Sequence, residues 1–240
     1  MLHTGHAAFR CPDPKSQLWR YMDFTKFISL LETRQLYFNR CDRFDDPYEG
    51  TVTRGTASLM RDQGQPEKDI AAYIEFSKVW RQQMYVNCWS KSEYESAAMW
   101  GLYLQTTEGV AIRTTASRLA AVLGPTPISV GLTDVMYVDY ERHAYNPGNI
   151  FHHYVYKRLS FKHEMEVRAV VWGVEQQNQP FIEPNAPHVL VDVDLSLLIE
   201  SIQVSPTAQP WFADLVGRCV KRYGLNVPVT QSDLYRSPLA

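Results

Sequence analysis

The chain has 240 residues, with 24 Lys plus Arg against 26 Asp plus Glu and 45% hydrophobic residues. This ordinary globular composition excludes a disordered chain, a basic nucleic-acid coat and an acidic tail protein, although a local basic groove stays open. No apolar run approaches the roughly 20 residues of a membrane span. The four cysteines form no CxxC or CxxH pair, so the sequence predicts a cytoplasmic protein with reduced thiols and no metal site.

The first half of the chain alternates strand and helix patterns. Gly5, Pro12 and Pro14 break any regular pattern, so we expect residues 1–16 to form a flexible leader. Asp23 precedes an apolar helical face and can cap that helix. In chain order the patterns predict a strand over 18–22, the helix after Asp23, a strand over 36–38, a turn-rich segment over 39–50, a helix over 67–84, a strand over 85–90, a helix opened by a capping box at Ser92 and Glu95, a strand over 110–112 and a helix over 117–123.

The second half predicts more strands. In chain order these are strands over 128–130 and 135–140, a helix over 150–159, strands over 165–172, 189–193 and 202–204, a helix from Pro206 to about Tyr223, and extended chain over 227–235. We therefore expect an α+β fold, formed by a single mixed domain over residues 17–240 with a split antiparallel or mixed sheet and flanking helices.

Glu164 and Glu166 are the first candidate site. Residues two apart on a strand point to the same face, about 6.5 to 7 Å apart, so two carboxylates there need cations or a substrate to offset their repulsion. Such a pair suits glycosidic cleavage, in which positive charge develops on the sugar. The alternative is a strand edge whose solvated charges pair with Lys162, Arg168 or Arg158.

Arg20 and Ser90 are the next candidates. An arginine inside an apolar run needs a partner anion, which is either a phosphate or one of the glutamates. Ser90 ends a predicted strand just before a helix, where its hydroxyl either holds a carboxylate or a ribose hydroxyl or simply ends the strand.

The loop over 39–50 is dense in functional groups. Arg40 and Arg43 are candidates for phosphate contact. Asp45 and Asp46 are expected to form a rigid turn by bonding their own backbone, although an acidic cluster with Glu164 and Glu166 around a metal is the basis of a nuclease alternative.

The chain resembles a bacterial family known as domain of unknown function 2971. The segments that carry the resemblance run in order over residues 18–236: Leu18-Trp19-Arg20-Tyr21, Leu36-Tyr37-Phe38, Phe44-Asp45-Asp46-Pro47-Tyr48-Glu49, Cys88-Trp89-Ser90, Met99-Trp100-Gly101-Leu102-Tyr103, Glu108-Gly109-Val110, Lys162 with Glu164-Met165-Glu166-Val167-Arg168, and Val204-Ser205-Pro206. That family brings no established activity.

The order of Arg20, Ser90 and the Glu164–Glu166 pair is also similar to the R-S-E group of ADP-ribosyltransferases. The resemblance implies an ADP-ribosyltransferase-like fold that takes NAD as its substrate. Glu166, Glu164 and Ser90 would then be catalytic, with Glu166 stabilising the charge on the ribose and Ser90 orienting it. The resemblance further implies NAD binding by Arg20, Tyr21, Tyr37 and Trp89, and substrate binding by Arg40, Arg43 and Asp46.

The sequence therefore predicts an enzyme that cleaves the nicotinamide–ribose bond of NAD and transfers ADP-ribose to a protein or nucleic-acid acceptor. Its partners would be a small-molecule nucleotide and that acceptor, with no membrane. Two alternatives stay open: a nucleotide- or nucleic-acid-binding module without chemistry, and a metal-dependent nuclease or hydrolase.

Overall fold

The predicted strands form the frame of the structure, a computed structural model that describes residues 2–3, 5–173, 182–183 and 186–238. The residues group into two compact units, which we describe separately. Unit 1 consists of Met1–Pro12, Tyr37–Cys88 and Thr126–Leu190, and unit 2 consists of Asp13–Leu36, Trp89–Pro125 and Val191–Ala240. The mixed α/β architecture with a mixed sheet is confirmed. The single domain over residues 17–240 stays a prediction.

Unit 1 is arranged around β9 (Glu166–Trp172), a strand whose seven residues are all buried. It pairs antiparallel with β6 (Val130–Asp134), which pairs parallel with β1 (Leu2–His3). On its other side β9 neighbours β4 (Met84–Lys91), and β4 pairs antiparallel with β3 (Gln35–Arg40). A near-continuous apolar sequence suits such a strand because both of its faces are covered. The strands β3, β4 and β10 (His188–Asp192) also contribute residues to unit 2.

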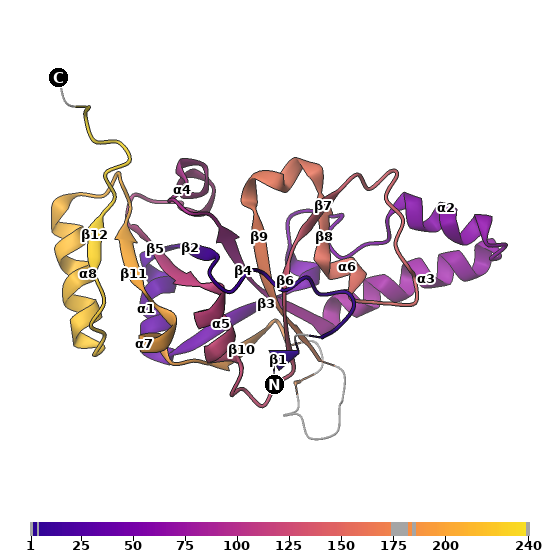
Figure 1. Ribbon diagram of the computed structural model, residues 1–240, viewed down its shortest axis with the longest axis horizontal. Helices are drawn as coiled ribbons and strands as arrows, with labels where there is room; N and C mark the ends of the chain where they lie inside the picture. Colours follow the sequence, from indigo (N-terminus) through magenta and orange to yellow (C-terminus); the bar gives the residue numbers. More distant parts are fainter. Residues whose placement is uncertain (1, 4, 174–181, 184–185, 239–240) are drawn as a thin grey trace. The chain divides into compact units, whose positions relative to one another are not determined.

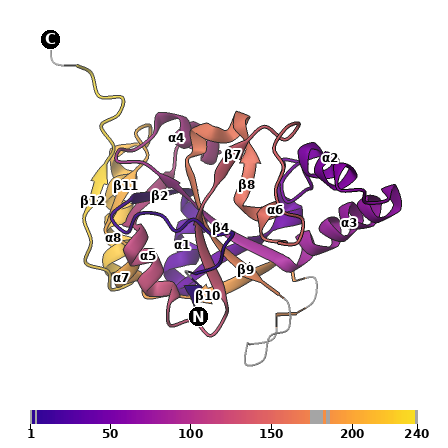
Figure 2. The same cartoon turned by 45° about the vertical axis from the view of Figure 1, so that its right-hand side comes forward.

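A second sheet of unit 1 pairs β7 (Met136–Val138) with β8 (Tyr156–Arg158) in parallel. The helices α2 (Arg54–Asp62) and α3 (Glu67–Trp80) lie side by side in both views (Figures 1 and 2), with Ile70 buried against α2. The remaining helical segments of unit 1 are short: α6 (His152–Val155), and the 3₁₀ helices η1 (Cys41–Arg43), η2 (Arg81–Gln83) and η3 (Leu159–Glu164).

Unit 2 contains an antiparallel run of β2 (Gln17–Asp23), β5 (Gly109–Thr115) and β11 (Ser201–Val204). β12 (Val229–Gln231) adds to β11 in parallel and lies beside α8 (Pro210–Arg222), as the yellow end of the chain in Figure 1 shows. The other helices of this unit are α1 (Phe24–Thr33), α4 (Ala97–Tyr103), α5 (Ala116–Leu123) and α7 (Leu195–Leu198).

The segment predicted as a flexible leader contributes to the structure of unit 1. Its residues 2–3 form β1, and Phe9 is buried in the apolar core. The ring of Phe9 packs directly on Gly131 of β6, where a Cβ would lie only 2.1 Å from it. The leader prediction was therefore wrong for this part of the segment, because pairing with β6 and burial of Phe9 in the core hold it in place. Residues 1 and 4 lie outside the described residues.

Several helix predictions needed correction. The chain over 150–159 forms only the short α6 before continuing as β8, so Lys157 lies on a strand. Ser96, rather than Ser92, caps α4, while Glu95 accepts a hydrogen bond from Trp100 Nε1. Pro210, rather than Pro206, occupies the first turn of α8. The structure also ends α3 at Trp80, four residues before the predicted end, and adds α2 and α7, which were not predicted.

Candidate functional site

Glu164 and Glu166 lie on either side of a sharp turn. Glu164 ends η3, whereas Glu166 begins β9. Met165 between them has a φ of 44°, a left-handed backbone conformation at which η3 ends before β9 begins. The prediction that both carboxylates share one face of one strand was therefore wrong.

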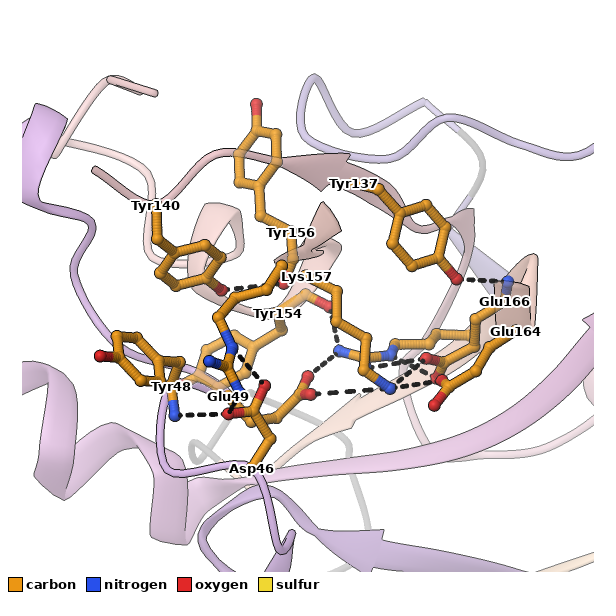
Figure 3. Close-up of polar contacts among 12 residues, drawn as sticks. Asp46, Tyr48, Glu49, Tyr137, Tyr140, Tyr154, Tyr156, Lys157, Glu164 and Glu166 are labelled. Carbon is orange, nitrogen blue, oxygen red and sulfur yellow. Dashed lines mark hydrogen bonds and ion pairs between the residues drawn. The ribbon is translucent and has the colours of Figure 1, made fainter. Parts of the chain in front are cut away.

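Both carboxylates nevertheless converge on the ammonium group of Lys157 (Figure 3). Its Nζ lies 2.5 Å from Glu164 Oε2 and 3.3 Å from Glu166 Oε2. Lys157 thus supplies the cation that a pair of like charges requires. Lys157 lies on β8, so its side chain comes from a different strand than Glu166.

Arg168 holds the second carboxylate from the same strand. Its Nε and Nη2 donate to Glu166 Oε1 and Oε2 at 2.6 and 3.0 Å, and its Nη1 donates to the carbonyl oxygen of Tyr154 at 3.0 Å. Nη1 also lies 2.5 Å from Glu49 Oε1, in an ion pair whose atoms are not aligned for a hydrogen bond. This confirms the alternative in which Arg168 pairs with the glutamates, but the charges are buried and not solvated.

These side chains form a buried cluster that carries an excess of negative charge. Each member is at most 9% exposed, and three carboxylates face two cations. A buried charge without a partner is costly, so such a cluster favours proton uptake by one carboxylate. We call the following five residues the ion cluster: Glu49, Lys157, Glu164, Glu166 and Arg168.

The two glutamates of the E-x-E pair respond to this environment in opposite directions. Burial raises the pKa of Glu164, and the nearby ammonium of Lys157 offsets this only in part. Burial also opposes ionisation of Glu166, but Arg168 and then Lys157 outweigh it and lower the pKa of that carboxyl to about 2. Glu164 is therefore the member of the pair that exchanges a proton most readily.

Two further groups fix the position of Glu166. The backbone N–H of Glu166 donates to the hydroxyl oxygen of Tyr137 at 2.7 Å, which Figure 3 shows at the edge of the cluster. The thiol of Cys88 donates to the Glu166 carboxylate, and burial, followed by the charge of Glu166, raises the pKa of that thiol. Glu166 is thus held from its backbone as well as from its side chain.

Arg158 lies next to the ion cluster but is partly exposed. Its Nε and Nη2 donate to Asp46 Oδ2 and Oδ1 at 3.2 and 2.8 Å. Its guanidinium carbon lies 4.3 Å from the ring centroid of Tyr48 and 5.3 Å from that of Phe161. Asp46 also accepts a hydrogen bond from the backbone N–H of Tyr48 at 3.1 Å, which confirms the predicted Asp turn at this residue.

The structure separates Arg20 from Ser90 within unit 2. In the antiparallel pair of β2 and β4, Trp19 lies directly opposite Ser90, so these two side chains share a face of the sheet. Successive side chains alternate between faces, so Arg20 points to the other face. There its guanidinium lies 5.9 Å from the ring centroid of Trp89. The prediction that Arg20 and Ser90 line one cleft was therefore wrong.

Two predicted NAD-binding aromatic residues belong to the apolar core instead. Tyr21 is 5% exposed, packs edge-on against Trp100 and accepts a hydrogen bond from the backbone N–H of Ser96. Trp89 is 2% exposed. Neither ring presents a free face for stacking on nicotinamide, because core packing already covers them.

The other predicted binding residues lie in unit 1, but separately. Tyr37 is exposed and stacks on His188 with the ring centroids 4.7 Å apart. Arg40 donates from Nε and Nη2 to both carboxylate oxygens of Asp42, at 2.7 and 3.1 Å. Arg43 is exposed in η1. Of the three residues predicted to bind substrate, only Asp46 lies beside the ion cluster, through Arg158.

Three of the four acidic residues assigned to a metal pair with side-chain cations. Asp46 binds Arg158, while Glu164 and Glu166 bind Lys157. Within the described ranges, no three His, Cys, Asp or Glu side chains gather in an arrangement that could hold a metal ion. The donor set therefore offers no support for the nuclease alternative.

Sequence reasoning missed Lys157 and Glu49. Lys157 fell inside a segment predicted to be helical, where a lysine carries no signal of burial. Glu49 follows Tyr48 in a segment predicted to be turn-rich, where a glutamate carries no signal of burial, but it is 2% exposed. The balance of charge was the available signal. Two carboxylates near β9 need a second cation besides Arg168, and this would have pointed to a lysine or arginine from another segment.

Comparison with known proteins found no matching family model, no matching curated protein and no matching solved structure. In the part of the chain that the structure describes, no helix has the length and apolar character needed to cross a membrane.

Proposed function

We propose that this chain is an ADP-ribosyltransferase-like enzyme that cleaves the nicotinamide–ribose bond of NAD at the ion cluster. ADP-ribose then passes to a protein side chain, a nucleic-acid base or water. The observation that supports the proposal best is the E-x-E pair itself: two adjacent carboxylates share Lys157, and their pKa values move in opposite directions. Such a division typically separates a proton-exchanging group from a permanently charged one.

Glu166 has the role of the permanent charge. As the bond from ribose C1′ to nicotinamide nitrogen breaks, its electron pair leaves with nicotinamide and positive charge develops on the sugar. An ionised carboxylate fixed by Arg168 and Tyr137 stabilises that charge without having to reorganise. Its low pKa keeps Glu166 ionised across the physiological range.

Glu164 has the role of the base. An oxygen or nitrogen atom of the acceptor forms the new bond to C1′, and Glu164 takes the proton that this atom loses. Its raised pKa brings it closer to the working pH than an ordinary glutamate, and its side chain is 11% exposed against 5% for Glu166. This keeps Glu166 in the charge-stabilising role that the resemblance implies and gives the role of base to Glu164.

A second candidate function is nucleotide binding without chemistry. The observation that favours it is the complete pairing of Glu166, whose two oxygens both accept hydrogen bonds from Arg168. A carboxylate held so firmly acts by charge alone. For either function we propose a cytoplasmic location, which the four free cysteines support.

Release of nicotinamide from NAD tests the proposal. Purified protein is incubated with NAD, with and without cell lysate as a source of acceptors, and nicotinamide is quantified by chromatography. We expect release by the wild type and a loss of roughly 100-fold or more in kcat for Glu164→Gln, since general-base catalysis contributes about that much. The matched control is Glu141→Gln, which removes an exposed glutamate paired with Arg54 and leaves the rate unchanged.

The outcomes separate the two candidates. Nicotinamide release that depends on Glu164 supports the enzyme. NAD binding without release, in the presence of lysate as well, contradicts the enzyme and supports the binding module. A wild type that neither binds nor cleaves NAD contradicts both.

A further inference from the structure

Arg158 is a guanidinium held in one orientation by its neighbours. Tyr48 and Phe161 flank it at 4.3 and 5.3 Å, measured from its central carbon to the ring centroids. Asp46 engages the edge formed by Nε and Nη2. Asp46 is in turn fixed by the backbone N–H of Tyr48, so the carboxylate that anchors Arg158 does not move freely.

This arrangement leaves one edge of the guanidinium available. Nη1 of Arg158, with its two N–H donors, has no partner among the residues that the structure describes. The Arg158 side chain is 33% exposed, whereas that of Asp46 is 6% exposed. The exposed end of this ion pair is therefore its cation, and a planar guanidinium is the group best suited to bind phosphate oxygens.

The position of Arg158 relates this edge to the ion cluster. Phe161 lies against both cations of β8: its ring centroid is 5.3 Å from the Arg158 guanidinium carbon and 4.8 Å from Lys157 Nζ. Lys157 in turn binds Glu164. Phe161 and Lys157 thus connect the phosphate position on Arg158 with the carboxylate that we assign as the base.

The net negative charge of the ion cluster means that the phosphates of a substrate need a cation outside the cluster. The cluster carries three carboxylates against two cations, so it repels the phosphates of a nucleotide. A substrate that brings its sugar to Glu164 needs a separate cation for its phosphates. Arg168 is fully buried and the side chain of Arg40 is only 12% exposed, so neither of them is as accessible as Arg158.

We propose that the Nη1 edge of Arg158 binds a phosphate of a nucleoside-diphosphate substrate, with Asp46, Tyr48 and Phe161 holding the guanidinium in place. This inference rests on the proposed function for the identity of the substrate. It replaces Arg20 as the phosphate-binding arginine, since Arg20 lies against Trp89 in unit 2. The role of Arg158 is binding, and it takes no part in bond breaking.

Equilibrium binding tests the proposal without requiring turnover. The affinities of the wild type, Arg158→Gln and the control Arg142→Gln are measured by calorimetry for ADP-ribose and for adenosine, which lacks phosphate. Arg142 is an exposed arginine near a single carboxylate, so its loss controls for net charge. We expect Arg158→Gln to weaken ADP-ribose binding roughly 10- to 100-fold, as for the loss of charge-assisted hydrogen bonds, and to leave adenosine binding unchanged.

A second measurement uses the wild type alone, in case Arg158→Gln does not fold. Phenylglyoxal modifies accessible arginines, and peptide mass spectrometry locates the product. We expect ADP-ribose and inorganic pyrophosphate to slow modification of Arg158 but not of Arg142 in the same sample. Unchanged modification of Arg158 at saturating ADP-ribose overturns the proposal.

The remaining outcomes keep this proposal distinct from the proposed function. Equal ADP-ribose affinity for Arg158→Gln and the wild type, or no ADP-ribose binding by the wild type, overturns the phosphate site. Phosphate-dependent binding at Arg158 without nicotinamide release supports the site and contradicts the enzymatic function. Equal losses for ADP-ribose and adenosine indicate a structural role and overturn the proposal.

Discussion

Glu164 and Glu166 share the ammonium of Lys157 although one ends a 3₁₀ helix and the other begins a strand. The left-handed residue between them, Met165, ends the 3₁₀ helix just before the strand begins. The two carboxylates thus occupy one buried site, and Glu166 in addition accepts hydrogen bonds from Nε and Nη2 of Arg168. Their unequal partners are the physical reason that their pKa values diverge.

We predict that neutralising the two glutamates has opposite effects on stability. Glu164→Gln removes the excess negative charge of the ion cluster, so we expect its free energy of unfolding at pH 7 to equal or exceed that of the wild type. Glu166→Gln leaves Arg168 buried with one fewer anion, and we expect a loss of about 3–5 kcal/mol. Urea unfolding of both variants tests this. A similar loss in both would contradict the unequal roles.

We predict that Glu166 contributes to acid unfolding in a defined window. Its pKa is about 2 in the folded chain against an ordinary value of 4.5, so the unfolded chain binds the proton first. The stability from this group is fully present above pH 4.5 and is lost as the pH falls toward 2, on the order of 3 kcal/mol in all. The free energy of unfolding, measured with urea at each pH in this range, should fall less steeply with decreasing pH for Glu166→Gln than for the wild type. An identical pH dependence of the unfolding free energy in the two proteins would contradict the lowered pKa of Glu166.

The apolar patterns predicted most strands because burial of their side chains is a local property. β2, β4 and β9 begin and end within one residue of the predicted segments, and β5 extends three residues beyond its predicted end. The helix predicted over 150–159 failed because tertiary pairing with β7 draws residues 156–158 into a strand.

The site was predicted only in part, for a related reason. The E-x-E pair is visible in the sequence because two acidic residues stand close together before an apolar strand. Lys157 and Glu49 are not visible, since their burial depends on which distant segments fold against β9. The face that a side chain takes is equally hidden: Arg20 and Ser90 each looked suitable for a site, but the register of β2 against β4 points them apart.

We predict that Arg20 and Ser90 contribute independently to the free energy of unfolding. Because their side chains lie on opposite faces of the sheet, the unfolding free energies lost in Arg20→Gln and Ser90→Ala should add in the double variant within about 0.5 kcal/mol. The positive control is Trp19→Phe with Ser90→Ala, two residues that lie directly opposite each other on one face. A larger deviation from additivity for Arg20 and Ser90 than for the control pair would contradict the register of β2 against β4.

We predict that activity on NAD rises with pH through the pKa of Glu164. A base must be ionised to take a proton, so the rate is low where Glu164 is protonated. Since burial raises that pKa, the acidic limb of the kcat profile should lie above pH 4.5, the ordinary value for glutamate. Steady-state kinetics from pH 4 to 8 measure it. The residual activity of Glu164→Gln should lack this limb, and a limb that persists in the variant would assign it to another group.

We predict that His153 makes unit 1 sensitive to mild acid. Its ring is buried between two hydroxyl groups, with Nδ1 2.9 Å from Tyr145 Oη and Nε2 2.8 Å from Tyr73 Oη. Burial is the main reason that the pKa of His153 falls from 6.5 to about 4. The folded chain therefore resists protonation that the unfolded chain accepts, so this contribution is complete above pH 6.5 and is lost as the pH falls toward 4.

This loss and that of Glu166 overlap only between pH 4 and 4.5, so the two contributions can be measured separately. It amounts to on the order of 3 kcal/mol if the full shift is expressed. His153→Gln should flatten the pH dependence of urea unfolding between pH 6.5 and 4. His163→Gln, which replaces an exposed histidine in η3, should retain the wild-type slope. If both variants keep that slope, the neutral histidine between Tyr73 and Tyr145 does not control stability in this range, and the acid sensitivity of unit 1 has another source.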